Sequence, residues 1–314
     1  MPEVITAGET MAVMAPKEAG PLRYVPDYRL RMAGAESNLA AGLCRLGHSA
    51  GWISRLGDDE MGRFVLNSVR AEGVDTCAVK TDGAHRTGLM LKETGSGETR
   101  VYYYRENSAA SHLSPEDLEE EYLHSARIIH LTGITPVLSG SCEDTVRTMA
   151  EFARRYGILL SFDPNIRKKL WGERDYRPLM RELLFSSQIA LLGLDEAEQL
   201  LWTRKPEEIV GILREKGVRW IALKDGSRGA WAADQEGLER IEPYPCRPVD
   251  PIGAGDAFDA AFLAGILEGR DLRTCGQMGG IAGAMATETS GDIEGCPSKE
   301  QIMAKLEKKQ EIFR

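Results

Sequence analysis

The sequence predicts an α/β protein with a doubly wound, mostly parallel sheet, helices on both faces of that sheet, and a small β-sheet lid. From residue 126 onward, short apolar runs alternate with helical patterns, as in βαβ units. Two stretches nearer the N-terminus alternate polar and apolar residues, as half-exposed strands do. With 314 residues, 42% of them hydrophobic, the chain can bury a large core. We expect one domain over residues 1–314, with lid strands from about 10–33 and 86–106.

The second half of the chain follows a regular order of elements. Expected strands are ARIIHL (126–131), ILLSFDPN (158–165), QIALLG (188–193) and VRWIALK (218–224). Expected helices are CEDTVRTMAEFARRYG (142–157), residues 175–186, DEAEQLLW (195–202) and PEEIVGILREKG (206–217). Such continuously apolar strands indicate a parallel sheet that is covered on both faces.

The first half combines one core strand with more exposed ones. VITAG (4–8) is expected in the main sheet. LRYVPDYRLRM (22–32) and the pair TGLMLKE and TRVYYYR (87–105), turned by TGSGE (94–98), are expected to form a small antiparallel sheet. The helical patterns SNLAAGLCRLG (37–47) and DEMGRFVLNSVRAEG (59–73) each end in Gly, which is favoured just after a helix. We assign Trp52, Trp202 and Trp231 to the core.

Composition excludes several classes of partner. The net charge of −9, without a compensating Lys/Arg run, argues against nucleic acid, and no apolar stretch approaches the ~20 residues of a membrane span. The six cysteines are scattered without metal-site spacing, and the N-terminus lacks the features of a secretory signal. We therefore expect a cytoplasmic protein with reduced thiols, which must concentrate positive charge locally to bind an anion.

The stretch DPIGAGDAFDAAFLAGIL (250–267) places Asp256 at the start of an apolar helix. Gly253, Ala254 and Gly255 have almost no side chain, so an anion can approach the free amides and the positive dipole end of that helix. Asp256 at this position is either a helix cap or a base. Phosphoryl transfer needs both the amides and a base, whereas a cap needs no preceding Gly-Ala-Gly.

Other nucleotide-binding motifs are absent, since the sequence contains neither a Walker loop nor a complete G-x-G-x-x-G. DPIGAGDAFDAAFL (250–263) instead resembles the C-terminal signature of the ribokinase-like (PfkB) carbohydrate kinases. AGAESNLAAGLCRLG (33–47) resembles the sugar-binding segment of that family, and GWISRLGDDEMGRFVLNSVRAEGVDT (51–76) resembles the block that follows it. The resemblance covers essentially the whole chain.

The resemblance implies a lid over the sugar and ATP along the carboxyl ends of the strands. It implies that Asp256 is the base and that the amides of Gly253, Ala254, Gly255 and Asp256 form the anion hole. In KDGSRGA (224–230), Lys224, Gly226 and Gly229 fall where the family lines its ATP site.

Two departures from the family pattern concern acidic residues. Glu36 stands where the family more often has a small residue, and Asp195 replaces the Asn of an Asn-Glu-x-Glu motif. Glu198 of that motif remains, and it either helps to order Mg²⁺ with its waters or is an ordinary acidic residue at a helix start.

The lid strand VYYYR (101–105) points to an acidic sugar. In an extended strand Val101, Tyr103 and Arg105 share one face, and Arg matches a carboxylate with two parallel hydrogen bonds. Arg167 follows a predicted strand in DPNIRKKLW (163–171), where it could hold substrate or ATP phosphate. YYYRENSAAS (102–111) together with this segment is similar to the 2-keto-3-deoxygluconate kinases within the superfamily.

These observations give one main hypothesis and two alternatives. The main hypothesis is an ATP- and Mg²⁺-dependent kinase for 2-keto-3-deoxygluconate. In it Gly34, Asn38, Tyr103, Arg105 and Arg167 hold the substrate, and Asn165 lies on the nucleotide side. The alternatives are a kinase for a neutral sugar of the fructokinase or ribokinase type, and a non-catalytic sugar sensor. A homo-oligomer formed through the lid is left open.

Overall fold

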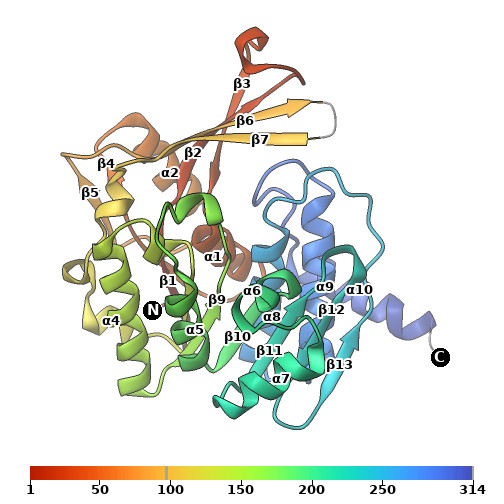
Figure 1. Ribbon diagram of the computed structural model, residues 1–314. Helices are drawn as coiled ribbons and strands as arrows, with labels where there is room; N and C mark the ends of the chain where they lie inside the picture. The colour runs from red at the N-terminus through yellow and green to blue at the C-terminus, as the bar shows by residue number, and fades with distance from the viewer. Residues whose placement is uncertain (96–97, 313–314) are drawn as a thin grey trace.

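The computed structural model describes residues 1–95 and 98–312, and within them the body is built on a nine-stranded sheet (Figure 1). In spatial order its strands are β13 (Leu238–Ile241), β12 (Ala230–Ala233), β11 (Trp220–Lys224), β10 (Ile189–Gly193), β9 (Leu159–Asp163), β8 (Ile128–Thr132), β1 (Val4–Ala7), β4 (Ala50–Gly57) and β5 (Val79–Asp82). Pairing is parallel from β11 to β5 and antiparallel for β12 and β13. The predicted doubly wound, mostly parallel sheet is confirmed.

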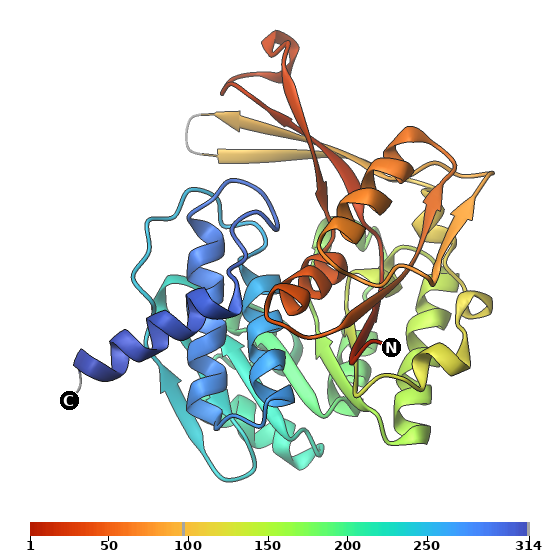
Figure 2. The same ribbon diagram turned by 180° about the vertical axis from the view of Figure 1, so that it is seen from behind.

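Helices cover both faces of this sheet, as Figures 1 and 2 show from opposite sides. One layer holds α1 (Ala35–Arg45), α2 (Glu60–Ala71), α8 (Ala254–Leu267), α9 (Leu272–Thr287) and α10 (Lys299–Ile312). The other holds α4 (Gly140–Tyr156), α5 (Arg177–Ser186), α6 (Leu194–Leu201) and α7 (Pro206–Glu215), and the short α3 (Glu120–Leu123) precedes β8. Each layer packs its apolar residues against one face of the sheet, which gives two hydrophobic clusters.

The tryptophan assignments are partly wrong. Trp52 is fully buried in β4, and Trp231 packs at the edge of the core. Trp202 is 73% exposed, because α6 ends there and the residue adopts a left-handed conformation (φ 58°) that turns the chain outward. Its ring instead lies against the Arg181 guanidinium, 4.7 Å away.

A second, four-stranded sheet projects from the body as the lid, at the top of Figure 1. Its order is β3 (Tyr28–Ala33), β2 (Met11–Pro16), β6 (Leu89–Gly95) and β7 (Glu98–Tyr104). The predicted β-sheet lid is confirmed, and its outer pairs are antiparallel as the alternating pattern suggested, but the central strands β2 and β6 pair in parallel. The expected strand at 22–32 begins only at Tyr28, after a 3₁₀ turn at Leu22–Tyr24. Residues 96–97 of the predicted TGSGE turn lie outside the described residues.

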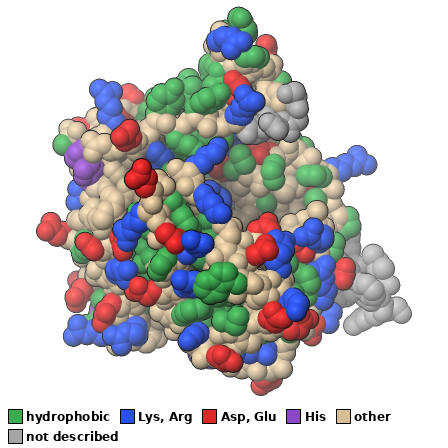
Figure 3. Space-filling view, viewed as in Figure 1, with side chains coloured by type: hydrophobic (Ala, Val, Ile, Leu, Met, Phe, Trp, Pro, Cys, Tyr) green, Lys and Arg blue, Asp and Glu red, His purple; other side chains and the backbone are tan. Residues whose placement is uncertain are grey.

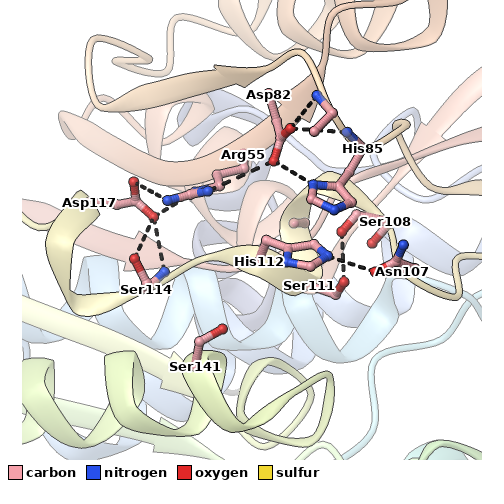
Figure 4. A network of polar contacts seen from close by, with 12 residues as sticks. Arg55, Asp82, His85, Asn107, Ser108, Ser111, His112, Ser114, Asp117 and Ser141 are labelled. Carbon is pink, nitrogen blue, oxygen red and sulfur yellow. Dashed lines mark hydrogen bonds and ion pairs between the residues drawn. The ribbon is translucent and has the colours of Figure 1, made fainter.

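Polar contacts fasten the root of the lid hairpin to the edge of the body (Figure 4). His85, just before β6, places Nδ1 3.0 Å from an oxygen of Asp82 at the end of β5. Its ring stacks on His112, which follows β7, with centroids 3.6 Å apart. Asp117 lies in the same segment as His112, and Arg55 of β4 donates hydrogen bonds of 2.7 and 2.9 Å to it. The start of β6 and the segment after β7 are therefore both fastened to the edge of the body at β4 and β5.

The described part of the chain contains no helix of the length and apolarity that crossing a membrane requires.

Candidate active site

A cavity of about 480 Å³ lies between the lid and the carboxyl ends of the main-sheet strands. Figure 3 shows a hollow below the lid with Lys and Arg side chains on its rim. The cavity is lined by Glu9, Met11, Gly34, Glu36, Asn38, Met90, Val101, Tyr103, Arg105, Asp163, Asn165, Arg167, Glu196, Lys224, Gly253, Gly255, Asp256 and Asp292, among others. Six of these side chains are acidic and three are basic, so an anionic ligand depends on those cations and on backbone amides.

The loop before α8 presents its amides to this cavity. Gly253 caps the helix with φ 78°, and a Cβ placed there would lie 2.1 Å from the Asp292 carbonyl oxygen, so only glycine fits. The amides of Gly255 and Asp256 find no acceptor among the described residues. The Ala254 amide differs, because it donates a long bond of 3.4 Å to the Pro251 carbonyl. Free amides at a helix N-terminus form a site for an anion.

Asp256 lies half-buried in the cavity wall beside these amides. Asn38 of α1 donates a hydrogen bond of 2.8 Å from Nδ2 to one oxygen of Asp256, which fixes the carboxylate across the two helices. Burial raises the pKa of Asp256 to about 7; the Asn38 bond opposes this rise, and the charges of Asp163 and Asp292 add to it. A carboxylate whose pKa lies near neutrality is suited to accept a proton from a substrate hydroxyl.

Lys224 ends β11 with its ammonium between two buried carboxylates. Its Nζ donates to Asp163 at 3.0 Å and to both oxygens of Asp259, at 3.0 and 3.1 Å. Burial alone would lower the pKa of Lys224, but the two carboxylates outweigh burial and raise it, so the ammonium stays charged. A Cβ on Gly255 would lie 3.9 Å from this Nζ, which places the cation at the edge of the amide loop.

The opposite wall holds the residues expected to bind sugar. Tyr103 and Arg105 both face the cavity, with the guanidinium 5.7 Å from the Tyr103 ring centre. Arg105 also forms an ion pair with the buried carboxylate of Glu9, while its buried Nε has no hydrogen-bond partner in the described structure. Gly34 caps α1, where a Cβ would come within 2.6 Å of the Glu9 carbonyl oxygen and the Thr10 hydroxyl.

Asn165 and Arg167 lie where β9 ends. Asn165 is buried with φ 38°, a strained angle for a residue other than glycine, and its Oδ1 lacks a hydrogen-bond partner among the residues described. Arg167 is exposed at the cavity wall and forms no ion pair with a described side chain. An unpaired guanidinium at this position can receive a phosphate or a carboxylate.

Four residues assigned from sequence lie outside the cavity wall, and one of them is Ala254, between Gly253 and Gly255. Gly226 and Gly229 form the turn between β11 and β12, and both have positive φ, 55° and 92°. Glu198 is exposed on α6 and pairs with Arg204, with 3.0 Å between the charged atoms. Glu196, two residues earlier and so on the other side of α6, lines the cavity in its place. The carboxylate of this motif that faces the site is therefore Glu196.

Sequence reasoning missed other acidic residues of the site. Glu36 was noted only as a departure from the family pattern. It is fully buried and accepts hydrogen bonds from the hydroxyls of Thr132 (2.6 Å) and Thr135 (2.7 Å), while its Oε2 is unpartnered in the described chain. Desolvation raises the pKa of Glu36 despite these bonds. Asp163 ends a buried strand, which is the signal that could have identified it.

A cavity beneath a lid, free amides at a helix start and a carboxylate with a pKa near neutrality suit phosphoryl transfer to a small hydroxylated molecule. The model of the "pfkB family carbohydrate kinase" matches residues 1–299. The chain belongs to this family of carbohydrate kinases.

Individual relatives match over nearly their full lengths. A 2-dehydro-3-deoxygluconokinase of Bacillus subtilis is 36% identical, covering 97% of this chain and 95% of that protein. A 2-dehydro-3-deoxygluconokinase of Thermoproteus tenax is 33% identical, covering 95% and 92%. A solved structure from E. coli, assigned as a ribokinase II in complex with ATP and Mg²⁺, is 26% identical with a TM-score of 0.88, covering 98% of this chain and 100% of that one.

Proposed function

We propose that this carbohydrate kinase transfers the γ-phosphoryl group of ATP to the terminal hydroxyl of 2-keto-3-deoxygluconate, a sugar acid. The observation that carries the proposal is the Arg105 guanidinium, which faces the cavity with a buried, unpartnered Nε. A substrate carboxylate would satisfy this donor with a charge-assisted hydrogen bond. A buried Nε that stays without a hydrogen bond is energetically costly. The names of the Bacillus and Thermoproteus relatives support the same substrate.

The residues of α8 would carry the chemistry. Asp256 accepts the proton of the substrate hydroxyl while that oxygen attacks the γ-phosphorus, and ADP leaves with the electron pair of the broken P–O bond. The amides of Gly253, Ala254, Gly255 and Asp256 would receive the charge on the transferred group. Gly34, Asn38, Tyr103 and Arg105 would hold the sugar acid against this loop, and Arg167 would bind either its carboxylate or the phosphates.

ATP would extend from the cavity toward the β11–β12 turn, past Asn165 and Lys224 to Gly226 and Gly229. No group of three His, Cys, Asp or Glu side chains within the described ranges is arranged to hold a metal ion. This fits Mg²⁺ that is bound mainly by phosphate oxygens and water, with Glu196 as the carboxylate that can orient those waters. The metal would neutralise phosphate charge during transfer.

A kinase for a neutral sugar is the second candidate, and one contact favours it. Arg105 already has a carboxylate partner in Glu9, so its charge is compensated without a sugar acid. A non-catalytic sensor is less well supported, because it has no use for a carboxylate with a pKa of about 7 beside free amides.

The test is ADP release by the purified protein with 2-keto-3-deoxygluconate, its galacto epimer, gluconate, fructose and ribose. The proposal requires the highest kcat/KM with a 2-keto-3-deoxy sugar acid. Preference for fructose or ribose would support the second candidate. Tight binding without ADP release from any member of the panel would support the sensor.

We further propose that residues 1–314 act as one unit and that two copies associate through their lids. The lid carries exposed Tyr24, Leu30, Tyr102 and Tyr104, which are 73%, 38%, 42% and 63% exposed. Analytical ultracentrifugation of the protein and of Tyr104→Glu tests the association. A dimer that the substitution weakens would support it, and a monomer at all concentrations would refute it.

A further inference from the structure

One lysine of the lid is buried against the body. Lys92 lies in β6 and is only 5% exposed. It points to the same side of the strand as Met90, which lines the cavity. Its Nζ lies 2.8 Å from an oxygen of Asp292 and 4.0 Å from an oxygen of Asp250. A buried lysine between two carboxylates is a costly arrangement that is retained where its position matters.

Both partners of Lys92 are joined to the anion-binding loop before α8. The Asp250 carboxylate accepts a hydrogen bond of 3.1 Å from the Ile252 amide, within the loop itself. The backbone of Asp292 packs directly on Gly253, the residue that caps α8. Lys92 thus links a lid strand to the two segments that shape the loop.

We propose that Lys92 is a positioning residue for phosphoryl transfer, which holds the lid strand β6 against the anion-binding loop and offsets the negative charge of Asp292 beside Asp256, so that Asp256 stays usable as a base. This inference rests on the proposed role of Asp256. Lys92 acts through Asp250 and Asp292, without contact to the reacting atoms.

The charges around Asp256 determine in which direction removal of Lys92 should change the ionisation of Asp256. The groups that surround Asp256 are Asn38 from α1, Asp163 from β9, Arg167 from the loop after β9, and Asp292 and the buried thiol of Cys296 from the segment before α10. Lys224 of β11 lies beside the adjoining Gly255. Asp163 and Asp292 raise the pKa of Asp256, and Arg167 lowers it. Burial raises the pKa of Asp292 and the paired Lys92 lowers it, so Lys92 acts on Asp256 by offsetting the charge of Asp292. Removing Lys92 while Asp292 stays ionised therefore disfavours ionised Asp256.

Substitution of a second lid residue can distinguish this electrostatic role from simple attachment of the lid to the body. Arg31 of β3 reaches the same body segment, where it donates a bond of 3.2 Å to the Ser290 hydroxyl and pairs with Glu294 at 3.2 Å. Arg31 does not line the cavity. Arg31→Met therefore breaks a lid-to-body contact whose carboxylate partner is Glu294 and leaves the Lys92–Asp292 pair in place, which makes it the matched control for Lys92→Met.

The experiment follows kcat against pH for the parent, Lys92→Met, Asp292→Asn, the double variant and Arg31→Met, at saturating ATP and sugar acid. Lys92→Met should move the acidic limb up by roughly 0.5–1 pH unit, and Asp292→Asn should move it down. The double variant should return close to the parent, and Arg31→Met should leave the limb in place. Since ionised Asp256 then becomes scarcer near neutrality, Lys92→Met should lower kcat at pH 7 about two- to fivefold.

Titration of Asp256 by ¹³C NMR gives the same comparison without any substrate, so a wrong sugar assignment does not affect it. The Asp256 resonance is assigned with Asp256→Asn. An equal pKa in the parent, Lys92→Met and Asp292→Asn would overturn the proposal, as would an equal shift in Arg31→Met. Should Lys92→Met fail to fold, Asp292→Asn and the double variant test the proposal instead. It then requires that the pKa of Asp256 is lower in Asp292→Asn than in the parent and close to the parental value in the double variant.

Discussion

The side-chain amide of Asn38 donates a 2.8 Å hydrogen bond to the carboxylate of Asp256 and so joins the starts of α1 and α8. This bond supplements the direct packing of α1 on α8, in which Gly42 lies against Ala260, and it fixes the Asp256 carboxylate at the cavity end of both helices. Because Asn38 is bonded to a single oxygen of Asp256, the other oxygen remains available to a substrate hydroxyl.

Replacement of Asp256, the proposed base, should remove most turnover and leave binding intact. Asp256→Asn keeps the shape and the Asn38 neighbour but cannot accept the hydroxyl proton, so kcat should fall on the order of 10²- to 10⁴-fold. Calorimetric titration with ATP and sugar should give dissociation constants close to those of the parent. Near-parental turnover would show that Asp256 is only a helix cap.

The same substitution should stabilise the protein at neutral pH. The folded-state pKa of Asp256, about 7, lies above its usual value of 3.8, so this group lowers stability progressively as pH rises from about 4 to about 7, and the full cost is present above pH 7. Asp256→Asn removes that cost and should be more stable by about 1–3 kcal/mol at pH 8. Urea denaturation at several pH values measures the difference, which should vanish below about pH 4. A difference independent of pH would contradict the assigned pKa.

Two glycines of the loop should respond differently to alanine. Gly253→Ala introduces a Cβ within 2.1 Å of the Asp292 carbonyl oxygen at φ 78°, so it should destabilise the fold by about 1–3 kcal/mol and disturb the amides. At Gly255 the nearest atom to an added Cβ is 3.9 Å away and φ is not positive, so Gly255→Ala should fold normally. Thermal denaturation and kcat of both variants provide the check. Equal stability of the two would contradict this account of Gly253.

Selectivity should depend on Arg105. Arg105→Leu should raise KM for 2-keto-3-deoxygluconate about tenfold to a few hundredfold, because a hydrogen bond to a charged group is worth roughly 1.5–3 kcal/mol. The ratio of kcat/KM for sugar acid over neutral sugar should fall as well. Since the substitution also leaves Glu9 buried and unpaired, Glu9→Gln combined with Arg105→Leu is the control for lost stability. An unchanged ratio would remove the carboxylate role.

The sequence predicted the main sheet and the helix start at Asp256 well, because both depend on local pattern. Period-2 and period-3.6 spacing, with glycines at helix ends, identify such elements without knowledge of the rest of the chain. The parallel pairing of β2 with β6 could not be predicted in this way, since it joins Val13 to Met90 and depends on the packing between them. The lid was therefore placed correctly, but its central pairing was not predicted.

The site residues also divide into those that a local sequence pattern predicts and those that depend on contacts between distant segments. Asp256, Gly253 and Gly255 belong to one short motif, and the alternation of β7 predicted that Tyr103 and Arg105 face one way. Ion-pair partners come from distant segments, and no spacing rule gives them. Glu9 for Arg105 and Asp292 for Lys92 are examples. Lys92 did leave a signal, since it stands on the inward face of an alternating strand, where a lysine needs a partner.

The parallel pairing of β2 with β6 has a consequence for how the protein folds. Between these strands the chain forms β3, α1, β4, α2 and β5, so the pairing closes a long loop whose entropy must first be offset by those elements. Until β2 pairs with β6, the antiparallel pairs β2–β3 and β6–β7 are separate two-stranded units. Isolated two-stranded hairpins are only marginally stable in water. The lid should therefore assemble after the body, which makes the sugar pocket one of the last parts of the molecule to acquire its shape.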